Sequence, residues 1–124
     1  MEFPPSVIDT LHRALEEDIG AGDITTSLLI SGEYESKAHY LAKGNFILAG
    51  LPFAREVFRI LDASSAFTML FHESAHIRKG DIIAEVSGKT QVILAGERVS
   101  LNILQRLSGI ATLTSIYVDK IKGL

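Results

Sequence analysis

The sequence predicts an α+β domain in which helices pack on a mainly antiparallel sheet. Three observations support this fold class: helical periodicity at both ends and near the middle, β-rich segments between these helices, and turn residues within the β-rich segments. The resulting order of helix, strands, helix, strands, helix is typical of an α+β domain.

The first predicted helix covers SVIDTLHRALEEDI, in which apolar residues recur three or four positions apart. These residues are Val7, Ile8, Leu11, Leu15 and Ile19. Ser6 is placed to cap the first turn, and Gly20 is placed to end the helix. We expect residues 20–35 to form a loop with short extended pieces.

The middle of the chain predicts strands on both sides of a second helix. SKAHYLAKG and NFILAG have the composition of two short strands, separated by a turn at Lys43-Gly44-Asn45. In GLPFAREVFRILDA, Pro52 suits a first helical turn. The apolar face of this helix comprises Phe53, Val57, Ile60 and Leu61. We expect AFTMLF, DIIAEVSG and TQVILAG to form further strands, because they are rich in β-branched and aromatic residues.

The last predicted helix runs from Gly96 onward, over about seven turns. Its apolar face comprises Val99, Ile103, Leu107, Ile110, Leu113, Tyr117 and Ile121. Gly109 costs about 1 kcal/mol relative to alanine inside a helix. We therefore expect Gly109 to let another backbone come close.

Composition excludes several classes of protein. The 124 residues are 47% hydrophobic and 22% charged, which is typical of one compact globular domain. The net charge of −3 and the absence of a dense Lys/Arg stripe argue against a nucleic-acid partner. There is no cysteine, no secretory signal pattern and no apolar run of about 18 residues, so we expect a cytoplasmic protein without a membrane span.

The stretch HESAH matches the zinc-peptidase pattern H-E-x-x-H, with His72 and His76 as metal ligands and Glu73 as general base. Glu97 lies downstream as a third ligand for such a site. However, the preceding residues alternate like a strand, and the turn at Lys79-Gly80-Asp81 leaves no room for the helix that the pattern requires. We expect two surface histidines near a hairpin.

The stretch EEDIGAGDITT has two glycines in a predicted turn, which is one feature of phosphate-binding loops. Such loops follow a strand and have cations nearby, whereas here Glu16, Glu17, Asp18 and Asp23 surround the glycines. The composition favours a turn that ends the helix, with Asp23 capping local backbone groups.

Arg98 has a distinctive position if the last helix begins at Gly96. Glu97 then suits the positive helix N-terminus, but Arg98 opposes it. An arginine and free N–H groups together favour a carboxylate or phosphate, so Arg98 is a candidate anion-binding residue. The alternative is a surface ion pair with a nearby acidic side chain.

Three longer segments together resemble one known family. ALEEDIGAGDITT, FILAGLPFAREVF and ERVSLNILQRLSGIATLT are similar to the N-terminal domain of quinolinate phosphoribosyltransferase, also called carboxylating nicotinate-nucleotide pyrophosphorylase. The most specific part is residues 97–114, in which E-R-x-x-L-N-x-L-Q-x-x-S-G-I-A-T, over residues 97–112, is a long match. A molybdenum-transport relative shares this domain, and EDIGAGD resembles the biosynthetic branch more closely.

The resemblance implies an α/β-hammerhead domain that precedes an α/β barrel in an enzyme of NAD biosynthesis that is a homodimer or a higher homo-oligomer. Quinolinate and phosphoribosyl pyrophosphate would give nicotinate mononucleotide, CO2 and pyrophosphate, with Mg2+. It also implies that Arg98 binds a quinolinate carboxylate across the dimer interface, and that the catalytic and metal-binding residues belong to the barrel.

On this basis residues 1–112 form the substrate-closing domain, and residues 113–124 end a helix that leads to a barrel absent from this chain. The chain alone would then be inactive, and its apolar helix residues beyond Ile110 would be exposed and favour self-association. A free-standing hammerhead module that binds other proteins remains the non-enzymatic alternative.

Overall fold

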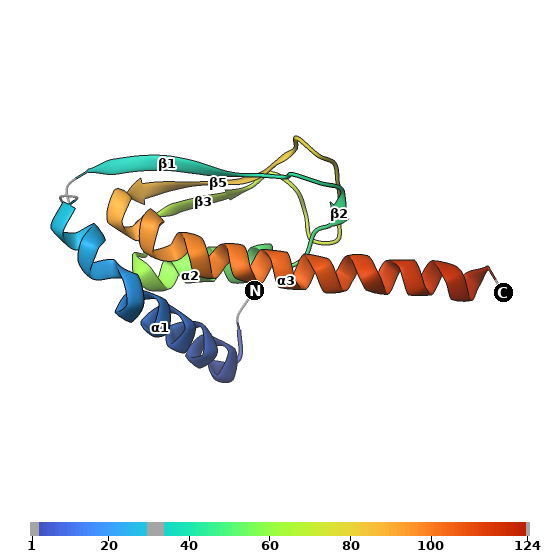
Figure 1. The fold of residues 1–124 in the computed structure, drawn as a ribbon, viewed down its shortest axis with the longest axis horizontal. Coiled ribbons are helices and arrows are strands. Elements are labelled where there is room, and N and C mark those ends of the chain that lie inside the picture. The colour runs from blue at the N-terminus through green and yellow to red at the C-terminus, as the bar shows by residue number, and fades with distance from the viewer. Residues whose placement is uncertain (1–2, 30–33, 124) are drawn as a thin grey trace.

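The computed structural model describes residues 3–29 and 34–123, and the side chains of residues 18–29 are not among the described parts. In chain order the elements are α1 (Pro5–Leu29), β1 (Glu35–Leu41), β2 (Phe46–Ile47), α2 (Leu51–Leu61), β3 (Ala66–Met69), β4 (His76–Ile77), β5 (Ile82–Lys89) and α3 (Thr90–Lys122), as Figure 1 shows. The predicted α+β class is confirmed.

The strands form two antiparallel sheets. The larger sheet has the order β1-β5-β3, and the smaller one pairs β2 with β4. The register of β1 against β5 runs from Glu35 opposite Lys89 to Leu41 opposite Ile82, with an irregularity at Tyr40 and Leu41. The two strands around Lys43-Gly44-Asn45 therefore do not pair with each other, because β1 and β2 belong to different sheets.

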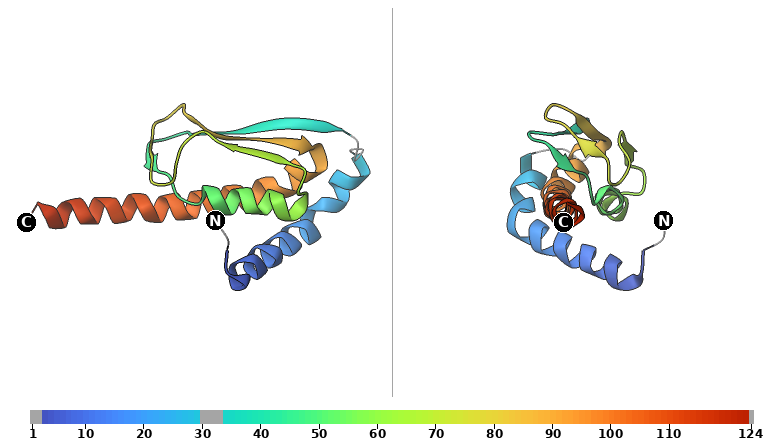
Figure 2. Two further views of the ribbon diagram at one scale, coloured as in Figure 1. Left: turned by 180° about the vertical axis from the view of Figure 1, so that it is seen from behind. Right: turned by 90° about the vertical axis from the view of Figure 1, so that its right-hand side faces the viewer.

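The domain has three layers. Figures 1 and 2 show the larger sheet above α2 and the first half of α3, with α1 on the opposite side of these two helices. The core between the sheet and the helices contains Phe58, Leu48, Ile77 and Val86, all at most 2% exposed. A smaller apolar cluster, formed by Leu11, Leu15, Val57 and Val99, attaches α1 to α2 and α3.

The N-terminal prediction is partly wrong. Leu11 and Leu15 are buried, as the helical pattern indicates, but α1 begins at Pro5, so Ser6 lies in its first turn. The helix then continues through Gly20 to Leu29, where the sequence predicts a loop. A glycine costs only about 1 kcal/mol inside a helix, which the surrounding helical hydrogen bonds can offset. Residues 30–33 lie outside the described residues.

The prediction of a strand at TQVILAG is also wrong, because this segment forms the first two turns of α3. Its β-branched residues are compatible with the helix, since Ile93 is buried in the core there. Gly96 is also buried, and a Cβ atom added to it would lie 2.6 Å from Cε1 of Phe58. Gly96 thus allows α3 to pack closely on α2 rather than marking a boundary between elements.

Candidate functional site

The HESAH segment is a turn and a short strand, not a helix. His76 begins β4, and Ser74 has a left-handed backbone with a φ of 69°. Among the described residues no group of three or more His, Cys, Asp or Glu side chains could hold a metal ion. The expectation that HESAH lies near strands rather than on a peptidase helix is confirmed.

Glu73 instead stabilises the N-terminus of α2. Its carboxylate accepts hydrogen bonds from the backbone N–H groups of Gly50 at 3.0 Å and Leu51 at 2.9 Å. These N–H groups have no partner within the helix, and an anion is favourable at this end of it. No local sequence pattern indicates this role, because Gly50 and Glu73 are distant in sequence.

The EEDIGAGDITT stretch is helical in backbone, since α1 continues through Gly22 and Asp23 to Leu29. The predicted turn at these residues is therefore wrong, and the backbone forms no loop that could surround a phosphate. The side chain of Asp23, to which we assigned a capping role, lies outside the described parts of the chain.

Arg98 is not at a helix N-terminus, which corrects the physical argument made for it. Because α3 begins at Thr90, Arg98 lies in the third turn, about 12 Å along the axis from the first residue. The free N–H groups of the first turn therefore do not act together with its guanidinium. Arg98 is exposed, whereas Val99 and Ser100 beside it are buried, so the helix directs Arg98 away from the core.

Three hydroxyl residues in or near the 97–112 motif join α3 to the β-rich part of the chain. The Ser108 hydroxyl accepts a hydrogen bond from the N–H of Ala49 at 3.0 Å and donates one to the carbonyl oxygen of Ala49 at 3.2 Å. Thr112 accepts a hydrogen bond from the N–H of Ile47 at 2.9 Å. These contacts satisfy backbone groups of β2 and of the segment between β2 and α2, so this part of the motif serves the fold.

The third hydroxyl residue, Ser100, is fully buried and bonds to a buried tyrosine. The oxygen atoms of Tyr40 and Ser100 are 2.5 Å apart, and the Ser100 hydroxyl donates to the carbonyl oxygen of Glu97 at 3.0 Å. Ser100 has one proton, so Tyr40 donates to it. Burial raises the pKa of Tyr40 to about 12, so the Tyr40 hydroxyl is protonated at neutral pH and can donate this hydrogen bond.

These hydroxyl contacts are not predicted by any local sequence pattern. The available signal was the recurrence of Ser100, Ser108 and Thr112 in the middle of an apolar helix, where such residues need a local or tertiary partner. The partners themselves are about sixty residues away in sequence, since the bonds join positions 40 and 100, 49 and 108, and 47 and 112.

Comparison with known proteins identifies the family. The N-terminal domain of quinolinate phosphoribosyl transferase matches residues 23–108 of this chain. The chain belongs to this family. It is 40% identical over 121 residues to a probable carboxylating nicotinate-nucleotide pyrophosphorylase of Synechocystis, covering 96% of this chain and 41% of that protein. The corresponding Bacillus subtilis protein is 44% identical over 104 residues, covering 84% of this chain and 36% of that protein.

Solved structures of quinolinate phosphoribosyltransferase relatives have the same fold. NadC from Streptococcus pyogenes superposes with a TM-score of 0.88 at 35% identity, covering 96% of this chain and 43% of that one. The nicotinate-nucleotide pyrophosphorylase of Francisella tularensis gives a TM-score of 0.86 at 33% identity, with 98% and 44% covered. The present chain thus spans about two fifths of the length of the relatives it matches.

Two predictions for α3 concern the exposure of its apolar residues near the C-terminal end and the surroundings of Gly109. The apolar residues after Ser108 are exposed, with Ile110 at 61%, Leu113 at 55%, Tyr117 at 59% and Ile121 at 68%. This confirms the expected exposure, while self-association stays a prediction. Nothing lies within 4 Å of a Cβ atom added to Gly109, so the close backbone approach predicted there does not occur among the described residues.

Among the described residues, no helix is both long and apolar enough to cross a membrane.

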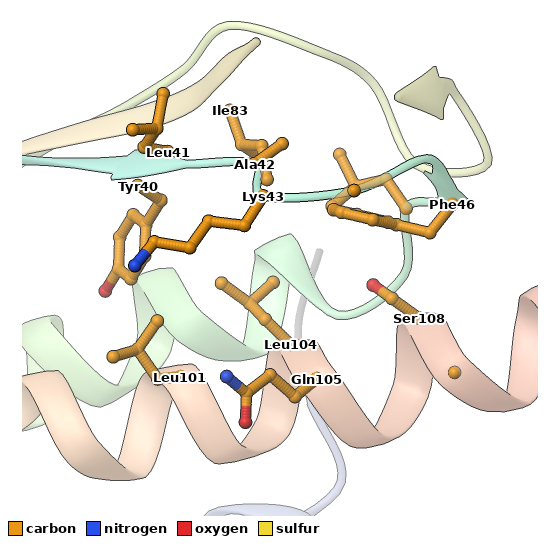
Figure 3. Close-up of a pocket in the computed structure, with 13 residues that line it drawn as sticks. Tyr40, Leu41, Ala42, Lys43, Phe46, Ile83, Leu101, Leu104, Gln105 and Ser108 are labelled. Carbon is orange, nitrogen blue, oxygen red and sulfur yellow. The ribbon is translucent and has the colours of Figure 1, made fainter. Parts of the chain in front are cut away.

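The structure also contains an apolar cavity between α3 and the segment that joins β1 to β2, shown in Figure 3. Arg98 is not among its lining residues.

Proposed function

We propose that this chain is the N-terminal, substrate-closing domain of an enzyme that converts quinolinate and phosphoribosyl pyrophosphate to nicotinate mononucleotide, CO2 and pyrophosphate. The observation that carries the proposal is the 40% identity over 121 residues to a probable carboxylating nicotinate-nucleotide pyrophosphorylase. The relatives reported above have pyrophosphorylase or NadC names, which favours the biosynthetic enzyme over the molybdenum-transport relative.

Within this function, Arg98 binds a carboxylate of quinolinate. Quinolinate is a dianion, and a guanidinium can bind a carboxylate through two parallel hydrogen bonds. The exposed position of Arg98 on α3 supports this role, because its charged group is directed away from the domain core. Arg98 acts through its own guanidinium rather than with a helix N-terminus.

The rest of the site lies outside this chain. We propose that residues 1–112 cover the active site of a second subunit in a cytoplasmic homodimer, and that residues 113–124 lead to the catalytic barrel. Mg2+ would accompany phosphoribosyl pyrophosphate, and its ligands would come from the barrel, because the described residues contain no suitable cluster of acidic side chains or histidines. The chain alone should therefore be inactive.

The test is a chimera in which this chain replaces the matching N-terminal segment of the Synechocystis relative, with the unmodified relative as positive control. We expect the chimera to consume quinolinate. Arg98→Ala should lower kcat/KM for quinolinate about 100-fold while changing the KM for phosphoribosyl pyrophosphate little, as expected for loss of a charged, paired hydrogen bond. Arg98→Lys should recover only part of this loss, because an ammonium does not form the paired geometry.

Arg106→Ala is the matched control, since Arg106 is an exposed arginine two turns further along the same helix. It should leave both kinetic constants unchanged. A cooperatively folded chimera without activity would contradict the proposed function. An active chimera whose quinolinate saturation is unaffected by Arg98→Ala would contradict only the role of Arg98.

A further inference from the structure

The cavity in Figure 3 has a volume of about 520 Å3, which is within the range of small-molecule binding sites. It lies between the end of β1 and the middle of α3, and aliphatic side chains such as Ile83, Leu101 and Leu104 form much of its wall. Figure 3 shows aromatic rings at two ends of this space, from Tyr40 and Phe46. Such walls suit a flat apolar molecule, because aromatic rings pack favourably edge to face.

The polar groups of the cavity fall into two classes. Tyr40 and Ser108 already have protein partners, since they bond to Ser100 and to the backbone of Ala49. Lys43 and Gln105 have no hydrogen bond or ion pair with any of the described residues. Lys43 reaches the cavity from the strand side and Gln105 from α3, so the two available donors approach it from opposite walls.

The charge of the cavity selects the ligand. Lys43 is a cation, and no Asp or Glu side chain lines the cavity to neutralise it. A single ammonium beside an apolar space complements one carboxylate on an apolar body. A phosphate is less suitable, because neither a helix N-terminus nor an arginine lines the cavity.

We propose that this cavity binds a small aromatic monocarboxylate, with the ring between Tyr40 and Phe46 and the carboxylate at Lys43 and Gln105. The ring contributes by leaving water for an apolar space, and the carboxylate gains charged hydrogen bonds from the two donors. Every residue that carries this proposal belongs to the described part of this chain. The proposal therefore goes beyond the function proposed above and does not depend on the role of Arg98.

The test is an NMR titration of the 15N-labelled chain with benzoate and, separately, with benzamide, which has the same shape without the charge. We expect saturable shifts at the backbone amides of Gly44 and Gln105, with benzoate binding about tenfold tighter than benzamide. Lys43→Met should weaken benzoate binding about three- to tenfold and leave benzamide unchanged. Lys43 is exposed, so this variant removes the cation without disturbing the core.

Lys120→Met is the matched control, because it makes the same change on an exposed lysine in the last turn of α3. It should leave both affinities unchanged. Equal affinities for benzoate and benzamide, or an unaltered benzoate affinity in Lys43→Met, would overturn the role of the cation. The absence of saturable shifts at the lining residues would overturn the site itself.

Discussion

The two halves of α3 share one periodic pattern but differ in their surroundings. From Thr90 to Ser108 the helix packs between the larger sheet, α2 and α1, and Val99 of the predicted apolar face is 6% exposed. From Gly109 to Lys122 the helix extends past these elements, as Figures 1 and 2 show, and its apolar residues are exposed. The pattern thus identifies an apolar face, whereas the neighbouring elements determine whether that face is buried.

The largest expected effect compares one leucine from each half. Leu104→Ala should lower the free energy of unfolding by about 3 kcal/mol, because it leaves a cavity in the core. Leu113→Ala should change it by less than about 0.5 kcal/mol, since this side chain is 55% exposed. Chemical denaturation followed by circular dichroism measures both values. Similar losses would show that the second half is also packed in solution.

A pair of glycines gives changes of opposite sign. Gly96→Ala should destabilise the chain by about 2 kcal/mol, because the added Cβ would meet the Phe58 ring at 2.6 Å and that ring is fixed in the core. Gly109→Ala should stabilise it by about 1 kcal/mol, because alanine favours the helix and meets no atom within 4 Å. Thermal and chemical denaturation test both changes. A stabilised Gly96→Ala variant would contradict the close packing of α3 on α2.

The buried pair of Tyr40 and Ser100 joins β1 to the first half of α3. This pair predicts that the free energy of unfolding depends on pH. The pKa of Tyr40 is raised from 10.0 to about 12, mainly by burial, so the folded chain keeps a proton that the unfolded chain loses. This contribution is present below pH 10 and is lost as pH rises from 10 toward 12.

Tyr40→Phe should therefore cost about 1 kcal/mol at neutral pH, through the lost hydrogen bond, and should lose less stability than the wild type between pH 10 and 12. Denaturation at a series of pH values measures the difference. Tyr117→Phe is the control, because Tyr117 is exposed in the second half of α3. Identical pH profiles for wild type and Tyr40→Phe would contradict the burial of a neutral Tyr40.

The smallest effect on stability is expected for the exposed second half. The double variant Ile110→Glu, Tyr117→Glu should change the free energy of unfolding by less than about 0.5 kcal/mol, because both side chains are exposed. It should reduce self-association, since it places charge on an apolar surface. Sedimentation at several concentrations tests this, and a wild-type chain that stays monomeric throughout would contradict the prediction.

Sequence alone predicted the elements whose signals are local. Pro52 and an apolar face predict α2, and a run of β-branched residues predicts β5. The prediction of a strand from Thr90 to Gly96 is wrong because the β-branched residues there are typical of a strand and Gly96 resembles a boundary between elements. The contact between Gly96 and Phe58, which favours the helix, joins positions that no local pattern connects.

The candidate site shows the same division. Arg98 is a candidate on two sequence grounds, its expected place at a helix N-terminus and the family resemblance of its segment, and the first ground is wrong because α3 begins at Thr90. Glu73 belongs to a metal-site pattern that the sequence itself argues against, and its role at the N-terminus of α2 depends on Gly50 and Leu51, which come from another part of the chain. The cavity with Lys43 and Gln105 was not predicted at all, since its walls come from β1, β2, the segments that follow these strands, β5 and α3.

The amino-acid sequence by itself therefore determined the fold class and the family, because periodicity and motifs depend on residues close together in the chain. Only the tertiary structure decided where α3 begins, which half of it is buried, and which polar groups bond to one another. The physical reason is that packing and hydrogen bonding join residues tens of positions apart, such as Tyr40 with Ser100 and Gly50 with Glu73.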